Sequence, residues 1–219
     1  MAGRPASRGA SRSAATRKRT RIQREKEEQI FESALEVFSR HGFRGATIDQ
    51  IAEQAGLSKP NLLYYFRKKE DIHRQLLDRL LDNWLEPLRK INADGDPLLE
   101  IQSYIRRKLE LARDYPRESR LFANEILQGA PHIQEELRDL RELVDEKSEI
   151  IRRWIEQGRM ARCDPRHLFF SIWATTQHYA DFDAQIKVVL GDSDSGEGRF
   201  EDAARFLDQL YVGGLRPIG

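Results

Sequence analysis

The chain has a single cysteine, Cys163, among its 219 residues. No disulfide can therefore form within one chain, which is compatible with a reducing cytoplasm. No apolar run approaches the roughly 18 residues that a membrane-spanning helix needs, and the basic N-terminal segment lacks the apolar core of a secretory signal. We therefore predict a cytoplasmic protein with no membrane partner.

The sequence also lacks the common patterns of catalysis and metal binding. It contains no H-E-x-x-H, no paired C-x-x-C, no phosphate-binding P-loop and no G-x-S-x-G. The histidines are scattered rather than spaced as metal ligands, at His41, His73, His132, His167 and His178. We therefore predict that the protein is not an enzyme and has no metal or cofactor.

The sequence predicts no β-strand, because no segment alternates apolar and polar residues as a strand does. Apolar residues instead recur at three- and four-residue steps, which predicts an all-α fold. Long helices are predicted over residues 25–41, from about 69 to the break at 92–97, and over 98–115, 116–128, 131–157, 164–190 and 199–212. We expect a DNA-binding domain over residues 25–70 and a helical effector-binding and dimerisation domain over residues 71–219.

The near-neutral net charge conceals a basic arm. Residues 1–24 hold eight of the 37 basic residues and none of the 36 acidic ones, so the rest of the chain is acidic. The arm is rich in Ser, Ala and Gly without an apolar period, and we expect it to be disordered in isolation. Near DNA it would add salt-dependent affinity that is blind to sequence; a solubilising tail is the alternative.

The segment from Thr47 to Phe66 predicts two short helices around a tight turn. Thr47 and Gln50 match a capping box at the start of the first helix, and Gly56 permits the left-handed backbone that ends it. Ser58 is the expected N-cap of the second helix, with proline in its first turn. This pattern is typical of a helix-turn-helix that places its second helix in a major groove.

Leu62 and Phe66 form the expected packing stripe of that second helix, which leaves Lys59, Asn61, Tyr64 and Tyr65 to point outward. Cationic, amide and phenolic groups suit phosphate oxygens and base edges. Because helix-turn-helix patterns are degenerate, an ordinary helical hairpin with half-buried tyrosines remains the alternative on this evidence.

A family resemblance rests on residues 42–69. The pattern G-F, then T-x-x-x-I-A-x-x-A-G-x-S-x-x-x-L-x-x-Y-F-x-x-K, resembles the DNA-binding domain of TetR-type transcriptional regulators. The resemblance implies a homodimer whose two heads bind a near-palindromic operator and whose helical C-terminal domain binds a small effector. With the N-cap Ser58 and the amide of Asn61 added, the predicted DNA-binding residues are Thr47, Ser58, Lys59, Asn61, Tyr64, Tyr65 and Lys69. The chain departs from the family at Leu63, where tyrosine is common.

Longer stretches resemble a pyrimidine-responsive branch of this family, namely NLLYYF, YIRRKLELARDYPRESRLF, DEKSEIIRRWI and SIWATTQHYADF. That resemblance implies uracil or thymine as effector and control of genes for pyrimidine degradation and nitrogen metabolism. By motif position it implies a nucleobase pocket that includes Trp84, Trp173 and Gln177. The polar side chains of His178 and Tyr179, next along the sequence, are added as candidates for a further polar contact. Without the resemblance, a tryptophan on an apolar helix face is more often core than ligand platform.

Two other functions remain open at this point. The C-terminal domain could respond to a different flat effector, such as a purine or an aromatic acid. It could also be an enzyme acting on a pyrimidine, for which the chain offers only isolated His178 and Asp181. The resemblance further implies that the dimer surface uses the last two helices, roughly residues 164–190 and 199–215.

Overall fold

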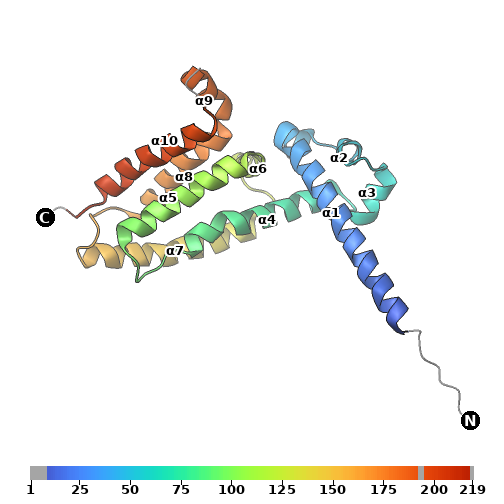
Figure 1. Cartoon of the computed structure of the whole chain (residues 1–219), viewed down its shortest axis with the longest axis horizontal. Helices are drawn as coiled ribbons and strands as arrows, with labels where there is room; N and C mark the ends of the chain where they lie inside the picture. The colour runs from blue at the N-terminus through green and yellow to red at the C-terminus, as the bar shows by residue number, and fades with distance from the viewer. Residues whose placement is uncertain (1–8, 192–194, 218–219) are drawn as a thin grey trace, which may run out of the picture. The chain divides into compact units, whose positions relative to one another are not determined.

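The computed structural model describes residues 9–191 and 195–217, and this part of the chain is helical without strands. The all-α prediction is therefore confirmed. The chain divides after His73 into two compact units, which are described separately below. Figure 1 shows their helices in order along the chain. The predicted boundary was between residues 70 and 71.

The first unit contains α1 (Gly9–Gly45), α2 (Ile48–Gln54) and α3 (Lys59–Tyr65). Gly42 interrupts α1 with a left-handed φ of 64°, at the residue where the sequence predicts the stop. The start differs from the prediction, because residues 9–24 of the expected disordered arm continue α1. Extending an existing helix needs no new nucleus, and the alanines, arginines and lysine of this segment have good helix propensity. Residues 1–8 of the arm lie outside the described residues.

The caps of α2 and α3 follow the predicted chemistry. The Thr47 Oγ1 accepts a hydrogen bond from the Gln50 N–H at 3.2 Å, and the Gln50 side chain accepts from the Thr47 N–H at 2.8 Å. Gly56 has a left-handed φ of 60° at the end of α2. The Ser58 Oγ accepts from the Asn61 N–H at 3.4 Å to begin α3. The helix-turn-helix prediction is therefore confirmed in its local geometry.

The core of the first unit gathers one apolar face from each helix. Its fully or almost fully buried side chains are Ile30, Phe31, Ala34, Leu35, Phe38, Ile51, Ala52, Leu62, Phe66 and Ile72. Phe31 and Phe66 meet edge to face at 5.1 Å between ring centroids, which fixes the end of α3 against α1.

Helix α4 (Lys69–Arg89) begins in the first unit and carries the chain into the second. One face of α4 is buried, with Trp84 and Leu88 among the buried residues. The second unit continues with α5 (Pro97–Asp114), α6 (Pro116–Leu127), α7 (Gln134–Glu156), α8 (Pro165–Asp181), α9 (Asp183–Leu190), α10 (Glu197–Leu207) and a π-helical turn, η2 (Asp208–Val212).

Helix α5 is the centre of the second unit, with α8, α10 and η2 packed against it (Figure 1). The predicted single helix over residues 164–190 is broken at Phe182 into α8 and α9. The break places the Asp183 carboxylate 2.6 Å from the Arg199 guanidinium of α10. Trp154 of α7 is a packing residue, since it is almost fully buried and its Nε1 donates to the Ala93 carbonyl at 2.9 Å. In the polar loop before α10, residues 192–194 lie outside the described residues.

Within the part of the chain that the structure describes, no helix is both long enough and apolar enough to cross a membrane.

Candidate functional site

The outward face of α3 presents the polar groups that the sequence assigns to DNA. Lys59 and Asn61 are exposed, and Tyr64 is 65% exposed. The Tyr64 and Tyr65 rings meet edge to face at 5.2 Å between centroids, so the two phenols form one aromatic pair at the surface. A short helix with an amide, phenols and a cation on one side can contact both phosphates and base edges.

Lys59 is paired across the turn with Asp49 of α2, at 2.9 Å between Nζ and Oδ2. Both side chains are more than half exposed, so the pair is screened by water and contributes little to stability. A phosphate can replace the carboxylate as partner at small cost. Lys59 is therefore held at the surface by an ion pair that contributes little to folding, and it remains available to bind a phosphate.

Lys69 has a different environment from the other predicted DNA-binding residues. Its Nζ donates to the carbonyl oxygens of Phe43 and Ala46, both at 2.8 Å, and lies 4.5 Å from the centroid of the Phe43 ring. These contacts fix the turn between α1 and α2 to the start of α4. The side chains of Thr47 and Ser58 likewise serve as helix caps, so these three residues position the head.

The second unit contains a cavity of about 230 Å³ between α4, α5, α6, α7 and α8. Trp84, Trp173 and Gln177 all line it, as the resemblance implies. Most of the remaining lining is apolar: Leu81, Leu85, Leu88, Phe122, Ile126, Leu137 and Leu140. The polar groups that complete it are Tyr104 and Lys108, both on α5.

Trp84 brings an indole N–H to the cavity wall. Its ring is buried, and its Nε1 is one of the buried polar atoms without a hydrogen-bond partner among the described residues. Leaving a buried donor unpaired costs about 1–3 kcal/mol. A carbonyl group of a ligand in the cavity would supply the missing acceptor.

Trp173, which also lines the cavity, is fixed in place by α5. Its Nε1 donates to the Tyr104 hydroxyl oxygen at 2.6 Å. Burial raises the pKa of Tyr104, so this group stays a neutral phenol and keeps a proton that it can donate. Trp173 also stacks on Phe169, at 6.4 Å between centroids. The Trp173 ring is therefore a preformed wall of the cavity.

Lys108 brings a positive charge into this apolar setting. It is only 5% exposed, and its Nζ lies 5.3 Å from the centroid of the Trp84 ring. Burial lowers the pKa of Lys108 to about 7, while the Asp181 carboxylate opposes that shift. Both protonation states of Lys108, the ammonium and the neutral amine, are therefore populated near neutral pH.

His178 and Tyr179 lie at a different place from the other predicted effector-binding residues. They line a separate, more open pocket between α8, α9 and α10, together with Ile186 and Phe206. His178 stacks on Phe182 at 4.8 Å between centroids. Neighbouring positions on a helix point about 100° apart, which is why Gln177 and His178 face different cavities. The structure thus does not bring His178 and Tyr179 to the tryptophan cavity.

Sequence reasoning missed Tyr104 and Lys108 as cavity residues. A signal was present, because both fall on the buried face of α5 with Ile101 and Ile105. A lysine at a core position of an amphipathic helix indicates an unusual environment, since lysine is almost never fully buried without a partner.

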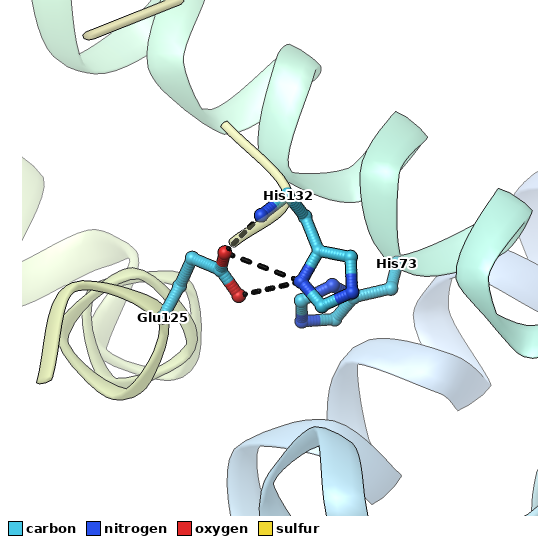
Figure 2. Close-up of side chains that lie close together, drawn as sticks. All are labelled: His73, Glu125 and His132. Carbon is cyan, nitrogen blue, oxygen red and sulfur yellow. Dashed lines mark hydrogen bonds and ion pairs between the residues drawn. The ribbon is translucent and has the colours of Figure 1, made fainter. Parts of the chain in front are cut away.

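A buried carboxylate fixes the turn that leads from α6 to α7, the two helices that supply part of the cavity wall. Glu125 accepts the backbone N–H of His132 at 2.7 Å, and its oxygens lie 3.1 and 3.2 Å from the His132 Nδ1 (Figure 2). Ala130 takes a left-handed φ of 54° in this turn, which its own N–H bond to the Glu125 carbonyl at 2.9 Å helps to hold. These contacts position Ile126 and Leu137.

Large apolar side chains are exposed on α8, α9 and α10 and at the break between α8 and α9. They include Phe170, Phe182, Val188, Val189 and Phe206, the last of which is 60% exposed, and Leu210 of η2 continues the set. Several exposed apolar side chains on neighbouring helices are typical of a protein interaction surface.

Comparison with known proteins assigns residues 30–218 to two family models. Residues 30–76 match the family described as bacterial regulatory proteins, tetR family, and residues 77–218 match the YcdC-like protein C-terminal region. The HTH-type transcriptional regulator RutR of Escherichia coli (strain K12) is 47% identical over 203 residues, which cover 92% of this chain and 96% of that protein. The HTH-type transcriptional repressor SCO4008 of Streptomyces coelicolor is 25% identical over 179 residues, covering 81% and 90%.

Solved structures show the same fold. The ketosteroid transcriptional regulator KstR2 of Mycobacterium tuberculosis superposes with a TM-score of 0.66 at 20% identity, covering 87% of this chain and 94% of that one. AibR in complex with isovaleryl coenzyme A and operator DNA superposes with a TM-score of 0.64 at 18% identity, covering 85% and 98%.

Proposed function

We infer the function from one premise: the chain belongs to the TetR family of bacterial regulatory proteins. It is a DNA-binding transcriptional regulator, and its relatives are regulators rather than enzymes. The prediction of a TetR-type regulator is thereby confirmed. What the regulator responds to, and how, is the proposal developed below.

We propose that the protein is a cytoplasmic homodimer that binds operator DNA when empty and releases it when uracil or thymine fills the tryptophan cavity. Its targets would be genes of pyrimidine degradation and related nitrogen metabolism, in line with the sequence resemblance to pyrimidine-responsive regulators. The observation that carries the proposal is the meeting of Trp84 from α4 with Trp173 and Gln177 from α8 around one cavity.

The lining matches the chemistry of a pyrimidine base. Uracil has flat π faces, which suit the two indole rings, and an edge that reads acceptor, donor, acceptor. The Gln177 amide can donate to a ring carbonyl and accept the ring N–H together. The unpaired Trp84 Nε1 and the Tyr104 hydroxyl are further donors for a carbonyl oxygen.

The size of the cavity also favours a small ring. Its volume of about 230 Å³ lies below the range of about 300–1,000 Å³ typical of pockets for drug-sized ligands. A single pyrimidine ring is a small ligand on this scale, whereas a long acyl chain would need more room.

The dimer proposal rests on the exposed apolar side chains of α8, α9, α10 and η2. A second copy of the chain that covers Phe182, Phe206 and Leu210 would remove this surface from water. Light scattering at micromolar concentration tests the proposal directly, and a monomer would contradict it.

Helix α4 offers the route from effector to DNA. It carries Trp84 at the cavity and starts at Lys69, which is bonded to the turn before α2. A ligand that binds better to one position of α4 than to another shifts the spacing of the two heads. Coupling of this kind is typically worth about 1–3 kcal/mol.

The proposal is tested by titrating an operator complex. A duplex that the full chain selects from a random-sequence pool is labelled, and release is followed by fluorescence anisotropy as nucleobases or aromatic acids are added. We expect uracil or thymine to release the duplex and to raise the melting temperature of the free protein. Release by a purine or an aromatic acid alone would replace the effector class, and no release by any of them would refute the proposal.

A further inference from the structure

Lys108 is a charged residue at a buried position, where the packing of the fold does not require a charge. It lies on the buried face of α5, where an apolar residue would complete the core. An ammonium group in such a place loses its hydration, and this loss is costly unless something else stabilises the charge.

The groups that face Lys108 supply only part of that stabilisation. The cavity lining from α4, α6 and α7 is uncharged, and from α4 the Trp84 ring faces Lys108, with its centroid 5.3 Å from Nζ. From α8 the Asp181 carboxylate acts on Lys108. Asp181 is itself engaged, because its Oδ1 accepts a 2.6 Å hydrogen bond from the Ser119 hydroxyl.

The cavity therefore combines one buried cation with a low-polarity lining. In such a setting a charge interacts far more strongly with an opposite charge than it does in water. Gln177, Tyr104 and the Trp84 indole can each bond a neutral carbonyl or amide edge, but they do not distinguish a neutral ligand from an anion as Lys108 does.

We propose that Lys108 makes the cavity selective for planar heterocycles with an acidic ring N–H, whose ring nitrogen passes its proton to Nζ on binding. The N–H bond of the ligand breaks, its electron pair stays on the ring nitrogen, and the proton completes an ammonium group that faces the resulting anion. This inference rests on the proposed function, since it concerns the same ligand in the same cavity.

The state of Lys108 in the empty protein suits this transfer. Because burial lowers its pKa to about 7, a substantial fraction is neutral amine at neutral pH and can accept a proton. After the transfer no net charge has entered the cavity, because the anion and the ammonium form together. The proton thus moves from the ligand to Lys108, and none is taken up from or released to the solvent.

The test compares two ligands of almost equal shape. 5-Fluorouracil differs from uracil by one fluorine, which makes the ring N–H more acidic. If the ligand binds as its anion, its affinity rises by up to about tenfold for each unit by which the pKa of its ring N–H falls. Binding is followed in the full chain by quenching of the fluorescence of Trp84 and Trp173, with calorimetry as a second readout.

Three proteins are compared at one pH. The wild type should bind 5-fluorouracil about tenfold more tightly than uracil, and Lys108→Met should bring the two affinities to within about twofold. Lys147→Met is the matched control, because Lys147 is also buried but bonds the Ile91 carbonyl, with Nζ 3.4 Å from the oxygen. Operator binding serves as the check of folding, and Lys108→Gln replaces Lys108→Met if the latter does not bind operator.

The outcomes separate the two proposals. Equal affinity of the wild type for both ligands, or a preference that survives in the Lys108 variant, overturns the inference while uracil binding still supports the proposed function. If neither base binds or releases operator DNA, the proposed function fails, and this inference fails with it. Loss of the preference in Lys108→Met but not in Lys147→Met supports it.

Discussion

Replacing Trp84 with Phe removes the indole N–H from the cavity while leaving an aromatic ring in place. In the empty protein the Nε1 has no partner among the described residues, so the substitution relieves an unpaired donor that costs about 1–3 kcal/mol. It also gives up part of the buried ring area. These two effects oppose each other, and we expect the stability of the empty protein to change by less than about 1 kcal/mol.

The effect on ligand binding should be larger. In the complex the Nε1 is expected to donate to a carbonyl oxygen, and a hydrogen bond of this kind contributes about 0.5–1.5 kcal/mol net. Its loss should weaken uracil or thymine binding by roughly two- to tenfold. The variant should therefore separate ligand affinity from stability.

Trp154→Phe is the matched control, with the opposite expectation. Trp154 is also buried, but its Nε1 donates to the Ala93 carbonyl at 2.9 Å. Its replacement leaves that carbonyl without its partner and should cost about 2 kcal/mol, which lowers the melting temperature by roughly 4–8 °C for a chain of this size. Because Trp154 does not line the cavity, ligand affinity at 25 °C should be unchanged.

Both variants are measured by thermal unfolding and by calorimetric titration with uracil and thymine. If Trp84→Phe binds the ligand as tightly as the wild type, the indole donor plays no part in recognition. If it instead lowers the melting temperature as much as Trp154→Phe does, Trp84 is a packing residue and the reasoning about its unpaired N–H is wrong.

Three further predictions concern the DNA surface and the cavity. Lys59→Ala should weaken operator binding and lower the slope of log affinity against log salt by about one, with ligand binding unchanged. Gln177→Ala should keep operator affinity but raise the uracil concentration needed for release by roughly tenfold; an unchanged titration would remove Gln177 from the site. The pKa of Lys108 is lowered from the ordinary value to about 7, so the unfolded chain binds more protons above pH 7. The free energy of unfolding of the wild type, relative to Lys108→Met, should therefore rise with pH by up to about 1.4 kcal/mol per unit between pH 7 and 9. Chemical denaturation at several pH values measures it, and a flat difference would contradict it.

The local signals of the head could be predicted from the sequence because they act within a few residues. Thr47 with Gln50, Ser58 and Gly56 each determine a cap or a turn through their own chemistry, and all took the expected geometry. The extension of α1 to Gly9 was missed. Composition suggests disorder for that segment, but composition does not register that a helix already formed can continue into it.

The cavity was only half predictable. Trp84, Trp173 and Gln177 were suggested by resemblance, and the structure brings them together. Tyr104 and Lys108 come from a helix about 70 residues away from Trp173 in sequence, and only packing shows which face of α5 meets α8. The break at Phe182 and the separation of His178 from Gln177 also depend on tertiary contacts, which no local pattern encodes.

The bond between Trp173 and Tyr104 makes one half of the cavity rigid before any ligand arrives. A ligand that does not fit this wall must then be accommodated by the part of the cavity around Trp84. There the indole Nε1 has no hydrogen-bond partner among the described residues. That part of the lining comes from α4 together with α6 and α7, and α4 begins in the first unit. If the cavity binds an effector as proposed, the rigid wall therefore favours a response in α4, the helix that connects the cavity to the DNA-binding unit.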